Sequence, residues 1–218
     1  MQQQNYHEIV ILKPTSVFLS FLAAQAPKAD LPPLEVLQRD TTAYSIPKQD
    51  GEEERIDEIE RHFPAMFRYE IRRWLGDEIT NPIEGSSLDF LCCFKFEIHT
   101  HIVLLEDAVE EAKQLLCVRP CSVLLKWIRS STEGHEEPAD VIERVSLSKL
   151  SQNATVVAKN FENKAAMELF VKQNYHEIYN AEMSRMCSNM EKWPDINSYD
   201  EFNHYFMIEP HSHVIHYV

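Results

Sequence analysis

Two histidines separated by one residue, His99 and His101, stand in the stretch FEIHTHIVLLED at residues 96–107. Residues i and i+2 of a β-strand face the same side, so these two imidazoles could hold one metal ion. Glu106 completes an H-x-H-x4-E pattern. Two imidazoles and a carboxylate on a transition metal leave open positions for a substrate. The pattern therefore raises the alternative of a metal-dependent enzyme.

The stretch HTHIVLLE resembles the core of the first motif of the cupins, which would imply a cupin-like metal-dependent enzyme. The flanking glycines of that family are absent, as is the second motif that supplies its last histidine. Strand alternation also places Glu106 on the face opposite His99 and His101. A polar, exposed strand face explains the histidine pair without a metal. We expect no metal and no cofactor.

A second histidine-rich run, PHSHVIHYV, ends the chain at residues 210–218. On a strand, His211 and His213 would share one face, whereas His216 would lie on the other. Because this run offers no additional ligand pattern, we interpret it as polar surface as well.

Cysteine is the other candidate for chemistry, and the chain has five. On a strand, Cys92 lies on the apolar face, where a thiol behaves as a small hydrophobe. Cys93 would face outward beside Lys95, but no nearby pattern pairs it with a base. The odd count fits free thiols in a reducing cytosol. We predict no catalytic residue and a protein that is not an enzyme.

Charge and glycine content exclude several classes of function. The formal net charge is −14 at pH 7 and the pI is near 5.1, which disfavours binding to nucleic acid or to an anionic membrane. Only four glycines occur, and no two of them are spaced to form a phosphate-binding loop. The most apolar run, residues 17–24, is too short to span a bilayer. No direct membrane insertion is expected.

Hydrophobic periodicity predicts interspersed strands and helices. Strands are expected at 6–12, 88–105, 121–130 and in a hairpin over 204–218. Helices are expected within 14–27, with Thr15 or Ser16 as the N-cap, and at 51–76, 108–116, 139–150 and 164–190, the last of them capped by Asn163. In the helix over 51–76, apolar residues such as Ile56 and Ile59 recur at spacings of three and four. Pro64 lies within this run and predicts a kink or a break. The hexapeptide QNYHEI occurs at 4–9 and 173–178, but the residues that follow diverge at once, so we interpret it as coincidence.

Alternating strands with short connections favour an α+β fold with an antiparallel or mixed β-sheet and helices packed mainly on one face. At 218 residues and 44% hydrophobic content, the chain is expected to form a single domain over residues 1–218. The segments near 26–34 and 130–138 are expected to be loops and not domain linkers.

A row of methionines near one face of the helix over 164–190 is the predicted partner-binding site. It consists of Met183, Met186 and Met190, with Trp193 just beyond the helix end. Methionine is adaptable and suits surfaces that accept several partners. Core packing is the alternative for the same residues.

The stretches FPAMFRYEIRRWLGDEI and SLDFLCCFKFEIHTHIVLLED, with the general look of the whole chain, resemble the LvgA-type adaptor subunits of the Dot/Icm type IVB secretion coupling complex. The resemblance implies a non-enzymatic, chaperone-like virulence adaptor in the bacterial cytoplasm, held at the cytoplasmic face of the inner membrane through its complex. It implies binding to the IcmS–IcmW adaptor pair and the C-terminal tail of the coupling ATPase, and recruitment of effector proteins for export. A secreted effector that binds a host protein is a further alternative.

Overall fold

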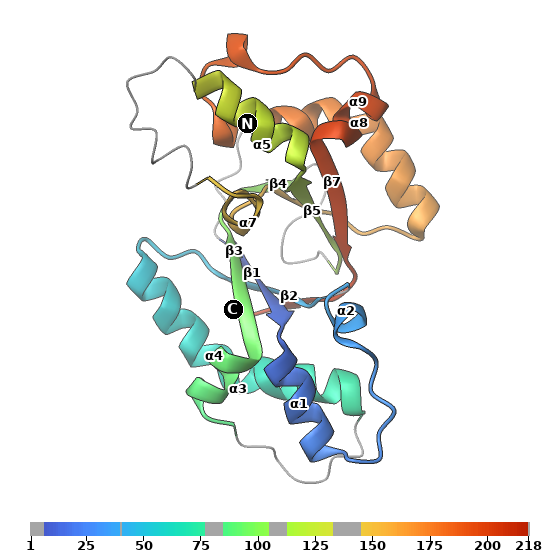
Figure 1. The fold of residues 1–218 in the computed structure, drawn as a ribbon. Coiled ribbons are helices and arrows are strands. Elements are labelled where there is room, and N and C mark those ends of the chain that lie inside the picture. The colour runs from blue at the N-terminus through green and yellow to red at the C-terminus, as the bar shows by residue number, and fades with distance from the viewer. Residues whose placement is uncertain (1–6, 40, 77–84, 105–112, 133–144, 218) are drawn as a thin grey trace. The chain divides into compact units, whose positions relative to one another are not determined.

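The computed structural model describes residues 7–39, 41–76, 85–104, 113–132 and 145–217 (Figure 1). The chain forms two compact units: unit 1 consists of residues 1–98 with 212–218, and unit 2 consists of residues 99–211. One domain over residues 1–218 is the expectation from the sequence. The division into two compact units does not test whether each unit folds independently, so that expectation stays a prediction.

Unit 1 is a four-stranded sheet with helices. Its elements are β1 (His7–Pro14), α1 (Ser16–Gln25), α2 (Leu34–Leu37), β2 (Ala43–Pro47), α3 (Glu52–Leu75), α4 (Ser87–Cys93), β3 (Phe94–His99) and β8 (Val214–His216). The strand order is β3-β1-β2-β8. β1 and β2 are antiparallel, whereas β2 and β8 are parallel, so the sheet is mixed.

Unit 2 is built in the same way. Its elements are β4 (Ile102–Leu104), β5 (Leu115–Pro120), α5 (Ser122–Thr132), α7 (Leu147–Gln152), β6 (Val156–Ala158), α8 (Lys164–Met186), the 3-10 helix η2 (Met190–Lys192), α9 (Tyr199–Tyr205) and β7 (Phe206–His211). The strand order is β4-β6-β5-β7, in which only β4 and β6 pair in parallel. The α+β fold class with mixed sheets is confirmed.

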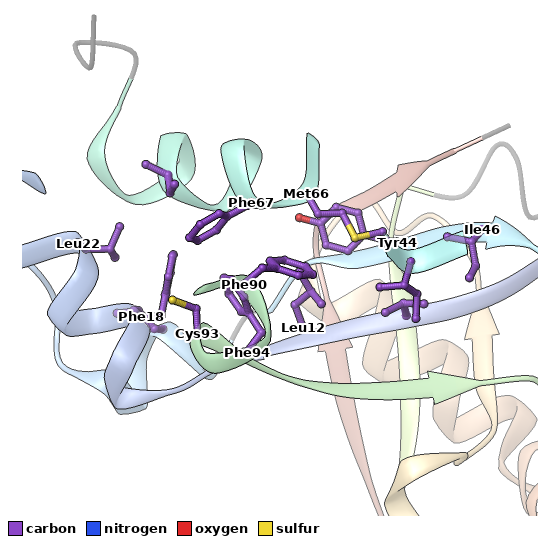
Figure 2. Close-up of a cluster of buried hydrophobic side chains, with 14 residues drawn as sticks. Leu12, Phe18, Leu22, Tyr44, Ile46, Met66, Phe67, Phe90, Cys93 and Phe94 are labelled. Carbon is purple, nitrogen blue, oxygen red and sulfur yellow. The ribbon is translucent and has the colours of Figure 1, made fainter. Parts of the chain in front are cut away.

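Each sheet buries one face against helices. In unit 1 the cluster combines Val10 and Leu12 of β1 with side chains of α1, α3 and α4. Figure 2 shows the Phe67 ring of α3 and the Phe90 and Phe94 rings within this cluster. In unit 2 the cluster combines Leu116 and Val118 of β5 with side chains of α5, α8 and α9. Burial of these aromatic and aliphatic groups is the main stabilising contribution to each unit.

Side-chain caps fix where several helices begin. Thr15 accepts a hydrogen bond from the Val17 amide at the start of α1, and Asn163 accepts one from Ala166 at the start of α8, as expected. Ser86 and Asp89 form a reciprocal capping box at α4. α3 continues through Pro64 as one helix.

The two units repeat one order of elements. In each, a strand leads into a helix, then a strand, a helix of more than twenty residues, a seven-residue helix and a third strand. The buried positions of the long helices match at a constant spacing of 112 residues. They are Glu58, Ile59, Met66, Phe67, Glu70 and Ile71 in α3, and Phe170, Val171, Ile178, Tyr179, Glu182 and Met183 in α8.

The same spacing is visible in the sequence once the elements are aligned. SSLDFLCCFKFEIHTHIV at 86–103 corresponds to SYDEFNHYFMIEPHSHVI at 198–215, and the two share S, F, F, E, H and H at equal positions. KPTSVFLSFL at 13–22 corresponds to RPCSVLLKWI at 119–128, at a spacing of 106 residues, so the segment between the first helix and the long helix is six residues longer in unit 2. The chain therefore contains an internal repeat that relates unit 1 to unit 2 and that was not expected from the sequence. QNYHEI plays no part in it, since one copy enters β1 and the other lies within α8.

Three predicted elements are wrong. The strand expected over 88–105 begins as helix α4, because the Ser86 cap starts a helix and Phe90 and Phe94 satisfy helical spacing as well as alternation. The strand expected over 121–130 is helix α5. The hairpin expected over 204–218 does not form, because β7 pairs with β5 and β8 pairs with β2.

The helix expected over 108–116 overlaps residues 105–112, which lie outside the described part of the chain. Its last two residues, Leu115 and Leu116, belong to strand β5. The helix expected over 139–150 is described only from residue 145, and α7 begins at Leu147.

Candidate protein-binding groove

His99 and His101 do not share an exposed strand face. β3 ends at His99 and β4 begins at Ile102, so His101 lies between two strands. The His99 side chain is fully buried, and its Nδ1 lies 2.8 Å from the carbonyl oxygen of Ala154. Glu106 lies outside the described residues. Within the described ranges no three His, Cys, Asp or Glu side chains gather as a metal site. The expected lack of a metal stays a prediction.

The C-terminal histidines occupy the equivalent positions of the repeat. His211 ends β7 and is fully buried, as His99 is at the end of β3. His213 is exposed, and its Nδ1 lies 3.4 Å from the Tyr69 hydroxyl. The expectation that these residues form polar surface is wrong for His211, because the third strand of each unit ends in a buried position.

Acid pH should destabilise unit 2 through His101. Burial lowers the pKa of His101 below its ordinary value of 6.5; the Glu182 carboxylate opposes this shift and Arg185 adds to it. The unfolded chain therefore binds a proton that the folded state resists, so stability falls as pH drops through 6.5. We expect His101→Gln to flatten the decline in urea midpoint between about pH 8 and about pH 5. The exposed repeat equivalent, His213→Gln, is the control, and an equal effect of both would contradict this assignment.

The cysteines are free thiols and two of them are poor nucleophiles. Burial raises the pKa of Cys93 to about 11, and burial also raises the pKa of Cys121. The expected orientations of Cys92 and Cys93 are reversed: Cys92 is exposed and Cys93 is buried, because this segment is a helix.

Alkylation should separate these two neighbours. We expect iodoacetamide at about pH 8 to modify Cys92 in the folded protein and to leave Cys93 unmodified, because the thiolate is the reactive species. Peptide mass analysis gives the site occupancy, and equal modification in urea is the control. Preferential labelling of Cys93 in the folded state would contradict the burial.

The four residues predicted to bind a partner occupy different environments. Met183 is fully buried in the core of unit 2, and Met186 packs against that core. Trp193 packs on Tyr179 and donates from Nε1 to the carbonyl of Cys187 at 2.9 Å. Met190 lies beyond the end of α8 in η2 and is 66% exposed. Partner binding by this set stays a prediction, and Met190 is its most accessible member.

The candidate site that the structure adds is an apolar groove on unit 1. It has a volume of about 370 Å³ and lies between α3, α4 and β3. Its lining is Glu52, Ile56, Ile59, Glu60, Phe63, Ser87, Phe90, Leu91, Phe96 and Ile98. The volume falls within the range of pockets that bind ligands. We call this set the α3–α4 groove.

Exposed aliphatic side chains stand at the edge of the α3–α4 groove. Ile56 is 48% exposed and Leu91 is 49% exposed, and Leu88 beside them is 67% exposed. The inner wall is core, since Ile59 and Phe90 are buried. The lining has two carboxylates, Glu52 and Glu60, and no cationic side chain. Such a surface offers apolar contact and attraction for positive charge.

The α3–α4 groove could not be predicted from the sequence for a specific reason. The periodicity places Ile56 and Ile59 on one apolar helix face, and the strand expected over 88–105 includes Leu88 and Leu91. The useful signal was the 112-residue repeat, which places polar residues at the equivalents of Ile56, Leu88 and Leu91.

Comparison of the chain with protein-family models, characterised proteins and solved structures finds no match. Among the described residues, no helix is both long and apolar enough to cross a bilayer. The resemblance to the LvgA-type adaptors stays a prediction.

Proposed function

We propose that this protein is a non-enzymatic adaptor that binds a segment of another protein in the α3–α4 groove. The observation that carries the proposal is the exposure of Ile56 and Leu91 in the lining of an apolar groove, with the exposed Leu88 next to the lining residue Ser87 in α4. Apolar side chains gathered at one surface depression are typical of sites that a partner covers.

The specific form of the proposal is an adaptor subunit of a type IVB secretion coupling complex. Its partners would be the IcmS–IcmW pair, the C-terminal tail of the coupling ATPase and exported effectors, at the cytoplasmic face of the inner membrane. The sequence resemblance supports this form, and the acidic charge of the chain suits basic partner segments.

The metal-dependent alternative has less support. It needs His99 and His101 on one accessible surface, and His99 is buried against the carbonyl of Ala154. We therefore do not propose a second function.

Native mass spectrometry of the tagged protein, isolated gently from its own host, tests the proposal. We expect it to co-migrate with protein partners and without metal. Two small subunits with a fragment of a coupling ATPase would support the specific form. A partner-free protein carrying about one transition-metal ion per chain would contradict the adaptor proposal.

A further inference from the structure

We infer that the α3–α4 groove binds a basic amphipathic helix of a partner protein. The inference deepens the proposed function and rests on it, because it names the chemistry of the bound segment. Its support comes from comparing the two units, which present the same surface with different side chains.

Unit 2 has an equivalent hollow of about 600 Å³ between α8, α9 and β7. Its lining includes Lys164, Glu168, Val171, Tyr199, Asn203, Ile208 and Pro210, which are the 112-residue equivalents of Glu52, Ile56, Ile59, Ser87, Leu91, Phe96 and Ile98. The inner positions are apolar in both units, as at Ile59 and Val171. The outer positions differ in polarity.

The outer positions of unit 1 are aliphatic where those of unit 2 are polar. Ile56 corresponds to Glu168, Leu88 to Asp200 and Leu91 to Asn203. Glu168, Asp200 and Asn203 are all exposed in unit 2. Because the same elements form in unit 2 with polar side chains there, the fold of unit 1 does not need the aliphatic ones. Exposed aliphatic groups that the fold does not need point to a partner that buries them.

Two acidic positions of the α3–α4 groove are basic in unit 2, where Lys164 lines the hollow together with Glu168. Glu52 and Glu60 in unit 1 correspond to Lys164 and Lys172 in unit 2. The α3–α4 groove therefore favours a cationic partner, whereas an acidic segment would meet two carboxylates.

A helix fits the spacing of these charges. Glu52 and Glu60 are eight residues apart on α3, which corresponds to about 12 Å along the helix axis. Lys or Arg side chains two turns apart on a bound helix would reach both carboxylates. An apolar stripe at i, i+3 and i+4 between them would pack against Ile56, Leu88 and Leu91.

Two synthetic peptides of about 15 residues test the inference. Both carry the same leucine stripe, and one has lysine and the other glutamate on the polar face. We expect the lysine peptide to bind the full-length protein, as measured by fluorescence anisotropy, and the glutamate peptide to bind at least about tenfold more weakly.

Substitutions that place the unit 2 side chain at the equivalent position of unit 1 locate the binding site without disturbing the fold. Ile56→Glu and Leu91→Asn should each lower the affinity for the lysine peptide by about tenfold or more. The double variant Glu52→Lys/Glu60→Lys should lower the affinity for the lysine peptide by about tenfold and raise the affinity for the glutamate peptide. The control is Leu169→Asp, at a position of unit 2 that is 56% exposed and equivalent to Asp57. It should change neither affinity.

Four results would overturn the inference. Equal binding of both peptides would remove the charge preference, and unchanged binding by Ile56→Glu would place the peptide elsewhere. A dimer that Leu91→Asn dissociates would show that a second copy covers the groove. If neither peptide binds while the protein from its host still carries partners, the inference fails and the adaptor proposal stands.

Discussion

Arg185→Leu is expected to lower the free energy of unfolding of unit 2 by about 3 kcal/mol, because it leaves a buried carboxylate without its cation. Glu182 is fully buried in α8, and Arg185 Nη2 donates to its Oε1 at 2.6 Å. The other carboxylate oxygen accepts from the Thr155 amide at 2.7 Å, which connects α8 to the start of β6. Arg185 is 17% exposed, so water compensates part of its loss.

Urea unfolding of single-tryptophan variants measures this effect unit by unit, since Trp127 and Trp193 lie in unit 2 and Trp74 lies in unit 1. The control is Glu182→Gln/Arg185→Leu, which removes the charge and keeps an acceptor for the Thr155 amide. It should recover most of the lost stability. Equal losses in the single and double variants would show that the buried charge is not the cause.

Phe90→Ala and Phe202→Ala are expected to destabilise their own units by about 3–5 kcal/mol each. The two positions are equivalent in the repeat, and their exposed fractions are 1% and 0%. The Phe90 ring lies 5.3 Å from that of Phe94, and the Phe202 ring lies 5.5 Å from that of Phe206, measured between centroids. Truncation removes these contacts and leaves a cavity that the surrounding helices fill only partly.

The same tryptophan signals separate the two effects. Phe90→Ala should shift the transition reported by Trp74, and Phe202→Ala the one reported by Trp127 and Trp193. Leu91→Asn is the neighbouring surface control, with an expected change within about 0.5 kcal/mol. A large effect of Phe202→Ala with none of Phe90→Ala would contradict the equivalence of the two cores.

The elements that sequence reasoning located well are those with strong local signals. α1 and α8 begin at the predicted caps Thr15 and Asn163, and α3 follows its apolar stripe. The break that was one expectation at Pro64 does not occur, because α3 continues through it as one helix. In these helices the capping side chain and the periodicity lie within one segment, so no distant partner is needed to interpret them.

The elements that it misassigned depend on distant partners or on ambiguous spacing. One example is the spacing of Phe90, Phe94 and Phe96. This spacing fits a single strand and also fits a helix followed by a strand, and the capping box at Ser86 is the local feature that favours the helix. β8 was expected beside β7, because adjacent segments often form hairpins. Its partner is β2, more than 160 residues earlier in the chain.

The candidate site could be predicted only in part. The acidic residues after Gly51 are visible in the sequence. The groove itself requires α3, α4 and β3 to converge, and two of those three elements were assigned to one long strand.

The order of synthesis has a consequence for unit 1. The parallel edge strand of each sheet follows the third strand of the other unit in the chain: β4 follows β3 and β8 follows β7. The ribosome therefore makes β1, β2 and β3 long before β8, and unit 1 exposes the open edge of β2 until residues 214–216 emerge. Truncation after His211 would leave that edge permanently open, as a template for pairing with another chain.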